Sequence, residues 1–257
     1  MRANRWVLLV SVLALVAGLM TWLVLANRKP PPPACTASTY RLSPAQAQNA
    51  ATIAVVGDRL GMPDHAVTVA LATALQESKL QNLTGGDRDS AGLFQQRPSQ
   101  GWGSYEQVTD PIYAATAFYQ RLRAQPNWTQ LSVTDAAQLV QRSGAPDAYA
   151  QWEPEARAFA GALTGQTAGA LTCTNLVLSA PATDIVTTAN AELGTAVLSG
   201  QHDTARGWSL ASWLVANASR FAVDQVTFDG QTWTAQSGSW SATGPADGTL
   251  SLHRWTG

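Results

Sequence analysis

The longest uninterrupted apolar stretch of the chain lies near its N-terminus, where Trp6–Ala26 carries no charged residue. At ~1.5 Å rise per residue, a helix of this length spans the ~30 Å hydrocarbon layer of a membrane. A cleaved signal peptide is the alternative, but its apolar region normally runs only ~7–15 residues. The pattern therefore predicts that residues 1–34 form one N-terminal transmembrane helix followed by the Pro-rich linker KPPPP.

Beyond this linker, apolar residues recur mainly at the three- and four-residue spacing of amphipathic helices. Ser43 and Gln46 have the spacing of a capping box, and the helix that they begin is expected to end near Arg59. Asp64 is expected to cap a second helix. Further helical patterns cover residues 111–123, 133–142 and 154–163. Residues 35–173 are therefore predicted to form a mainly α domain.

Residues 174–257 mix helical and strand-like patterns. Helices are predicted around Asp184–Leu193 and over Trp208–Phe221. Asp229 and Gly230 stand between β-branched and aromatic residues, which is the strongest short-range signal for a hairpin. The alternating stretch TLSLHRW adds a further strand. These residues are predicted to form a small α+β domain.

Charge narrows the possible partners of the chain. It contains 16 Lys and Arg against 17 Asp and Glu, for a formal net charge of -1. No basic face for nucleic acid is indicated. No motif for a metal ion or a cofactor stands out either, and nothing in the sequence specifies a protein partner.

The two cysteines, Cys35 and Cys173, have no metal-like spacing. A disulfide between them would close a long loop and stabilise the enclosed region by ~4–5 kcal/mol in the chain-entropy model. Two separate free thiols are the alternative. A disulfide favours an oxidising compartment. The predicted location is therefore the cell membrane, with a single span and both folded domains extracytoplasmic.

The stretch ALQESKL, residues 74–80, ends an apolar helical face at a single carboxylate, Glu77. A carboxyl group that lies partly in apolar surroundings favours its protonated form, which is the form that a general acid for glycosidic cleavage needs. A Glu at a helix end is, on its own, an ordinary surface residue. The segment that follows, SAGLFQQRPSQGWG, favours the catalytic interpretation.

QES and GLFQQ together resemble the Q-E-S and G-L-M-Q motifs of the lysozyme-like lytic transglycosylases. The similarity spans about Thr39 to Leu163, and it extends to membrane-anchored actinobacterial proteins with a lysozyme-like domain. It implies a helical lysozyme-like fold with a cleft for peptidoglycan glycan strands. It also implies that Glu77 is the catalytic acid and base, supported in position by Ser78. Phe94 stands where the family has a cleft-lining Met, and Gln95 matches the glutamine near the sugar.

The sequence departs from the family at the motif that provides a tyrosine to the catalytic Glu. Val140 stands in the place of that tyrosine and Gln141 in the place of the following Asn. Tyr149 and Tyr119 are the candidates for the missing hydroxyl. Gln141 and Tyr149 thus join the predicted substrate-binding set.

A second carboxylate would decide between two mechanisms. A lytic transglycosylase uses one Glu, whereas an inverting hydrolase needs a second carboxylate ~6.5–9.5 Å away to activate water. Asp87 and Asp89 are the nearby candidates, with Asp89 the possible second carboxylate; both also suit loop capping. The resemblance favours the single-Glu route through cleavage of the β-1,4 bond between N-acetylmuramic acid and N-acetylglucosamine. The alternative is a non-catalytic cell-wall-binding or scaffold protein.

The C-terminal stretch from GWSLASW to FDGQTW loosely resembles the end of domains related to D-Ala-D-Ala carboxypeptidases. That family holds zinc through a His, an Asp seven residues on, and a later His. His202 and His253 are present, but position 209 is Ser, and a catalytic zinc site needs three protein ligands. A degenerate domain without metal is therefore expected.

Overall fold

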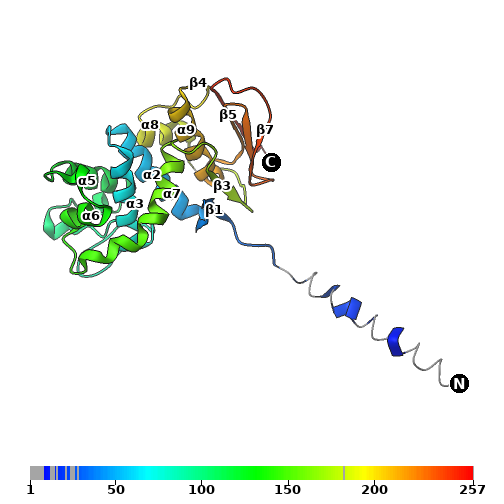
Figure 1. Cartoon of the computed structure of the whole chain (residues 1–257), viewed down its shortest axis with the longest axis horizontal. Helices are drawn as coiled ribbons and strands as arrows, with labels where there is room; N and C mark the ends of the chain where they lie inside the picture. The colour runs from blue at the N-terminus through cyan, green and yellow to red at the C-terminus, as the bar shows by residue number, and fades with distance from the viewer. Residues whose placement is uncertain are drawn as a thin grey trace. The chain divides into compact units, whose positions relative to one another are not determined.

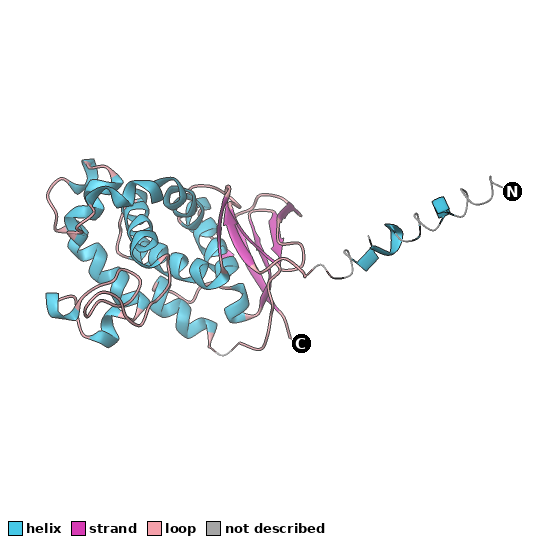
Figure 2. Ribbon diagram, turned by 90° about the horizontal axis from the view of Figure 1, so that it is seen from below, coloured by secondary structure: helices cyan, strands magenta, loops and turns pink. Residues whose placement is uncertain are grey.

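The computed structural model describes residues 9–11, 15, 17–20, 22–23, 27, 29–181 and 183–256. The chain divides into two compact units, Met1–Pro32 and Pro33–Gly257. In the second unit, helices gather on one side and strands on the other (Figure 1, Figure 2). Contacts across residue 173 hold both predicted domains within this one unit.

Among the residues that the structure describes, no helix is long and apolar enough to cross a membrane. This finding contradicts the predicted transmembrane helix over Trp6–Ala26 and the single-pass membrane location that rests on it. A span needs about 20 residues of continuous apolar helix, so an apolar run in the sequence is not sufficient evidence for one. Residues 6–8, 12–14, 16, 21 and 24–26 of the predicted span lie outside the described residues.

The part of the chain before Cys173 contains most of the helices. They are α2 (Pro44–Arg59), α3 (Asp64–Ser78), η1 (Pro98–Gln100), α4 (Tyr105–Val108), α5 (Pro111–Arg123), η2 (Trp128–Gln130), α6 (Val133–Gln141), η3 (Pro146–Trp152) and α7 (Glu153–Leu163). Helix α3 is buried along most of its length and contacts α2, α5, α6, α7 and η3. The central helix therefore ends at the residues that the sequence analysis singled out.

Local sequence explains where these helices begin. Ser43 and Gln46 form the expected capping box at the start of α2. Asp110 accepts hydrogen bonds from the backbone N–H groups of Ile112 and Tyr113 at the start of α5. Asp64 is the first helical residue of α3 and not its cap, because Pro63 occupies the cap position. The predicted helices over residues 111–123, 133–142 and 154–163 are confirmed to within one residue.

The same region contains a sheet that the sequence analysis did not predict. Its antiparallel strands, in the order β2-β1-β3, are β1 (Ala34–Ala37), β2 (Tyr40–Leu42) and β3 (Leu171–Thr174). The prediction of a mainly α domain is wrong in this respect, since the unit is about half helical with two antiparallel sheets. Strands of three or four residues are too short to show an alternating pattern in the sequence.

This small sheet holds the predicted disulfide. Cys35 and Cys173 are directly opposite each other on β1 and β3, and their sulfur atoms are bonded. The disulfide is thereby confirmed, and the two ends of the helical region are joined both by backbone hydrogen bonds and by a covalent bond.

The rest of the unit packs helices against a second sheet. Its elements are α8 (Ile185–Leu193), β4 (Gly200–Gln201), α9 (Thr204–Ala216), α10 (Ala218–Phe221), β5 (Val223–Phe228), β6 (Gln231–Thr234), β7 (Trp240–Ala242) and β8 (Thr249–Arg254). The antiparallel sheet has the order β4-β8-β5-β6-β7. Asp229 (φ 50°) and Gly230 (φ 73°) confirm the predicted hairpin between β5 and β6. The helix predicted over Trp208–Phe221 is interrupted at Asn217.

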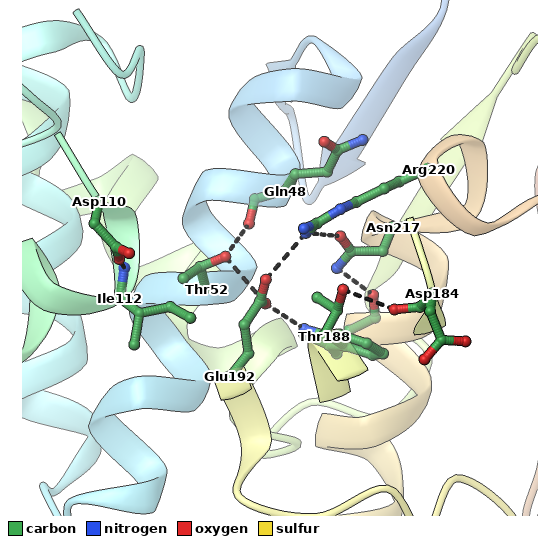
Figure 3. Close-up of polar contacts among 10 residues, drawn as sticks. Gln48, Thr52, Asp110, Ile112, Asp184, Thr188, Glu192, Asn217 and Arg220 are labelled. Carbon is green, nitrogen blue, oxygen red and sulfur yellow. Dashed lines mark hydrogen bonds and ion pairs between the residues drawn. The ribbon is translucent and has the colours of Figure 1, made fainter. Parts of the chain in front are cut away.

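A buried carboxylate links this part to the helices before it. Glu192 on α8 is 3% exposed, and its Oε2 accepts hydrogen bonds from Thr52 of α2 (3.1 Å) and from Trp213 of α9 (2.8 Å). Its Oε1 pairs with Arg220 at 3.0 Å (Figure 3). Because buried charges are costly unless paired, this cluster fixes how α8, α9 and α10 pack on α2.

Candidate active site

Glu77 lies at the C-terminal end of α3, where the chain reverses sharply. Lys79 (φ 55°) and Leu80 (φ 58°) both adopt the left-handed backbone conformation. Their carbonyl oxygens accept hydrogen bonds from Gln46 Nε2 (2.8 Å) and Asn49 Nδ2 (2.7 Å) of α2. Side chains of a neighbouring helix thus provide hydrogen bonds to the carbonyl groups at the end of α3 and hold Glu77 in place.

Ser78 connects this helix end to the loop that contains GLFQQ. Its buried hydroxyl group lies 2.7 Å from the carbonyl oxygen of Leu93 and 3.0 Å from that of Ala74. Gly92 is required in this loop, since its φ is 79° and an added Cβ would lie 1.9 Å from the carbonyl oxygen of Val108. The QES and GLFQQ motifs therefore contact each other through Ser78, which holds the loop against the end of α3.

Phe94 lies in the core and does not line a cleft. Its side chain is fully buried and stacks on Phe118, with ring centroids 4.7 Å apart. Its backbone carbonyl accepts a hydrogen bond of 2.9 Å from Gln141 Nε2. Gln141 thus holds the loop from the opposite side, at the end of α6.

A cleft of about 450 Å³ opens in front of Glu77. It is lined by Glu77, Asp87, Arg88, Ser90, Gln95, Arg97, Gln100, Trp102, Gln141, Arg142, Ser143 and Gly144. Three predicted site residues, Glu77, Gln95 and Gln141, are therefore brought together. Gln95 is held by a 3.0 Å hydrogen bond from Ser90. The volume lies within the range of small-molecule sites.

The tyrosine hydroxyl next to the candidate catalytic carboxylate comes from Tyr149 in η3. It donates a hydrogen bond of 2.8 Å to Glu77 Oε1. Tyr149 is fully buried, and burial together with the charge and the hydrogen bond of Glu77 raises its pKa. The phenol therefore stays protonated at neutral pH. Tyr119, the other candidate, donates to the carbonyl oxygen of Ile53 in the core at 2.9 Å.

Asp89, the possible second carboxylate, accepts hydrogen bonds from residues of its own loop. It accepts hydrogen bonds from the backbone N–H of Ser99 (2.7 Å) and from Arg97 Nε (2.8 Å), and these hold its pKa well below the usual range. Asp89 is not among the residues that line the cleft. Asp87 does line it, but its carboxylate is almost fully exposed beside Arg88.

The cleft also contains residues that the sequence analysis did not identify. Arg97, Arg142 and Ser143 line it, and the guanidinium group of Arg121 covers the indole of Trp102 at 3.5 Å from the ring centroid. Trp102 is therefore buried beneath an arginine and does not offer a bare stacking face. For Arg142 and Ser143, the available sequence signal was the polar run QRSG at the end of an amphipathic helix.

The histidines of the C-terminal part are apart from this cleft. His253 Nδ1 lies 2.7 Å from Asp224 Oδ1 at the sheet, and the Nε2 atom of His202 is buried without a hydrogen-bond partner. In the described part of the chain, no group of three or more His, Cys, Asp or Glu residues could hold a metal ion.

One family model matches the chain. Residues 181–251, from just before α8 into β8, are similar to the family described as "VldE, C-terminal domain". This match covers less than half of the chain and does not include Glu77 or the other cleft residues. A comparison with curated proteins gives no match.

Proposed function

We propose that the cleft around Glu77 cleaves peptidoglycan glycan strands at the β-1,4 bond between N-acetylmuramic acid and N-acetylglucosamine. The observation that carries this proposal is the 2.8 Å hydrogen bond from Tyr149 to Glu77 at the edge of a 450 Å³ cleft. The resemblance of QES and GLFQQ to the lytic transglycosylase motifs supports the same assignment. Tyr149 would supply the hydroxyl group that is missing at Val140, the position of the family's tyrosine.

The proposed reaction needs one carboxyl group. Protonated Glu77 donates its proton to the glycosidic oxygen as the bond from that oxygen to C1 of the muramic residue breaks. The carboxylate then accepts the proton of the 6-hydroxyl group of the same residue while O6 bonds to C1. Glu77 regains its proton, no water is consumed, and the product has a 1,6-anhydro end. Since Tyr149 occupies Oε1, Oε2 is the atom that would transfer the proton.

The remaining residues of the site would position the substrate. The amide groups of Gln95 and Gln141 line the cleft and are suited to the hydroxyl and acetamido groups of sugars. An extracytoplasmic location is part of the proposal, because its substrate is there. The Cys35–Cys173 disulfide supports this location, since disulfides persist in oxidising compartments.

Glu77→Gln tests the proposal. Purified cell wall is incubated with the native chain and with the variant, and soluble muropeptides are analysed by mass spectrometry. Native protein should release products with anhydro-muramic ends, and Glu77→Gln should release none. Glu106→Gln is a matched control, because Glu106 is exposed on α4 and does not line the cleft.

The glycan ends also distinguish the alternatives. Reducing ends would indicate a muramidase-type hydrolase and overturn the single-Glu route. Cell-wall binding by both proteins without any released product would overturn catalysis and favour the non-catalytic binding protein. Equal release by the native chain and Glu77→Gln would exclude Glu77 as the acid.

A further inference from the structure

The cleft continues past Glu77 into a second hollow of about 350 Å³. The two share Gln100, Trp102, Gln141 and Arg142. Of the described residues that line the second hollow, Arg121 and Arg142 are the charged ones, and none is a carboxylate. The first hollow thus contains the carboxylates of Glu77 and Asp87, whereas the charged residues that line the second are both cationic.

Arg121 is held rigidly in this hollow. Its guanidinium group lies 3.5 Å from the ring centroid of Trp102, and Nη2 donates a 2.7 Å hydrogen bond to the carbonyl oxygen of Gly101. A guanidinium group has five N–H donors in a fixed plane, so donors are left for a ligand. Little side-chain freedom remains to be lost when an anion binds.

Arg142 reaches the same hollow from the end of α6. It caps that helix with a left-handed backbone (φ 52°), and its side chain is exposed. Neither Arg142 nor Arg121 takes part in an ion pair among the described residues. Burial first, and then the charge of Arg142, lowers the pKa of Arg121. Two like charges close together without a carboxylate are unfavourable until an anion binds.

The other arginines that line the cleft, Arg88 and Arg97, each lie beside a carboxylate. Arg97 bonds to Asp89 at 2.8 Å, and Arg88 lies beside Asp87 at 3.8 Å. A carboxylate of the loop thus accompanies each of them. Arg121 and Arg142 are therefore the cleft arginines without an ion pair among the described residues.

We infer that Arg121 and Arg142 bind a carboxylate carried by the glycan next to the glycosidic bond that Glu77 would protonate. The inference rests on the proposed function and names its substrate class, an acidic saccharide. The carboxylate can belong to the lactyl group of a muramic residue without a peptide, or to a peptide attached to that group. Both offer a planar anion that suits bidentate binding by arginine.

A binding experiment that does not depend on turnover tests the inference. The full chain with Glu77→Gln is titrated by calorimetry with the disaccharide GlcNAc-MurNAc bearing a free lactyl carboxylate, and with its lactyl methyl amide. The free acid should bind about tenfold more tightly than the amide. Arg142→Gln, added to Glu77→Gln, should remove this difference and leave binding of the amide unchanged. Arg157→Gln is the control, because Arg157 pairs with Glu153 on α7, away from the cleft.

A third probe distinguishes the two sources of the anion. It is the same disaccharide with the nitrogen of an alanine joined by an amide bond to the lactyl carboxyl group, so that the carboxylate of the alanine is free. Tighter binding of this probe than of the lactyl acid would assign the site to a peptide carboxylate, and the reverse to the lactyl group; either supports the inference. Equal binding of acids and amide, or no binding of any probe, would overturn it. Failure of the native chain to cleave cell wall would overturn the proposed reaction alone.

Discussion

The hydroxyl group of Tyr149 donates a hydrogen bond to Glu77 across 72 positions of the sequence. Tyr149 lies in η3, whereas Glu77 ends the central helix α3. In the resemblance to the lytic transglycosylase motifs, Val140 takes the place of the motif's tyrosine, and it lies on the buried side of α6. A residue nine positions later thus presents a phenol to the same carboxylate, which makes the pair the centre of the candidate site.

Tyr149→Phe should lower the rate of glycan cleavage about 10- to 100-fold without unfolding the chain. The variant removes the hydrogen bond to Glu77 and keeps the aromatic ring. Hydrogen bonds to charged groups contribute about 1.5–3 kcal/mol, which corresponds to that change in rate. Product release from cell wall is the measurement. Tyr119→Phe is the matched control: it loses a buried hydrogen bond to Ile53, so it should lower stability by about 1 kcal/mol and leave the rate unchanged.

Stability should fall at alkaline pH because of the same two tyrosines. Burial raises the pKa of both Tyr119 and Tyr149 in the folded chain. Above about pH 10 the unfolded chain loses these protons and the folded chain keeps them. The free energy of unfolding should therefore be unaffected below that pH and fall above it, by up to about 1.4 kcal/mol per pH unit for each tyrosine.

Urea unfolding between pH 9 and pH 11.5 measures this effect. The variant with both tyrosines changed to Phe should show a shallower pH dependence than the native chain. The same slope in both proteins would show that other groups control alkaline unfolding.

Gly92→Ala should disrupt the loop that faces Glu77. The substitution places a Cβ 1.9 Å from the carbonyl oxygen of Val108 and imposes a left-handed backbone on a non-glycine residue. A cost of about 1–3 kcal/mol in unfolding free energy is expected, with a loss of activity. Gly85→Ala is the control, because nothing lies within 4 Å of its added Cβ. Equal effects of the two variants in urea unfolding and cell-wall cleavage would contradict the assigned role of Gly92.

Arg220→Met should destabilise the chain by about 3 kcal/mol, because it leaves the carboxylate of Glu192 buried with only neutral partners. Glu192→Gln in the same chain should recover part of the loss, which a double-mutant cycle of unfolding free energies measures. Arg157→Met removes the more exposed pair with Glu153 and should cost at most about 0.5 kcal/mol. Additive effects of Arg220→Met and Glu192→Gln would show that the buried pair is not coupled.

Local signals in the sequence located most helices correctly. The capping box at Ser43 and Gln46, and the proline after Asp110, place two helix starts to the residue. Asp229 and Gly230 likewise specify a hairpin, because they accept the left-handed backbone that a tight turn needs. These features depend on contacts within a few residues and can therefore be predicted from the sequence alone.

Predictions that rested on composition or on a family position were less successful. The apolar N-terminal run did not correspond to a membrane-spanning helix among the described residues. The strands β1, β2 and β3 were missed, because each has only three or four residues and β1 pairs with β3 from the far end of the helical region. Phe94 was placed in the cleft from its motif position, but it packs on Phe118 in the core.

The sequence by itself determined the starts of α2 and α5 and the hairpin at Asp229 and Gly230, and it indicated a Cys35–Cys173 disulfide and Glu77 as a candidate site residue. Only the tertiary structure decided that Tyr149 and not Tyr119 meets Glu77, and that Arg121 and Arg142 face one hollow. The physical reason is the range of the interactions. Caps and turns are satisfied within a few residues, whereas a cleft depends on how distant helix ends pack, which no local pattern encodes.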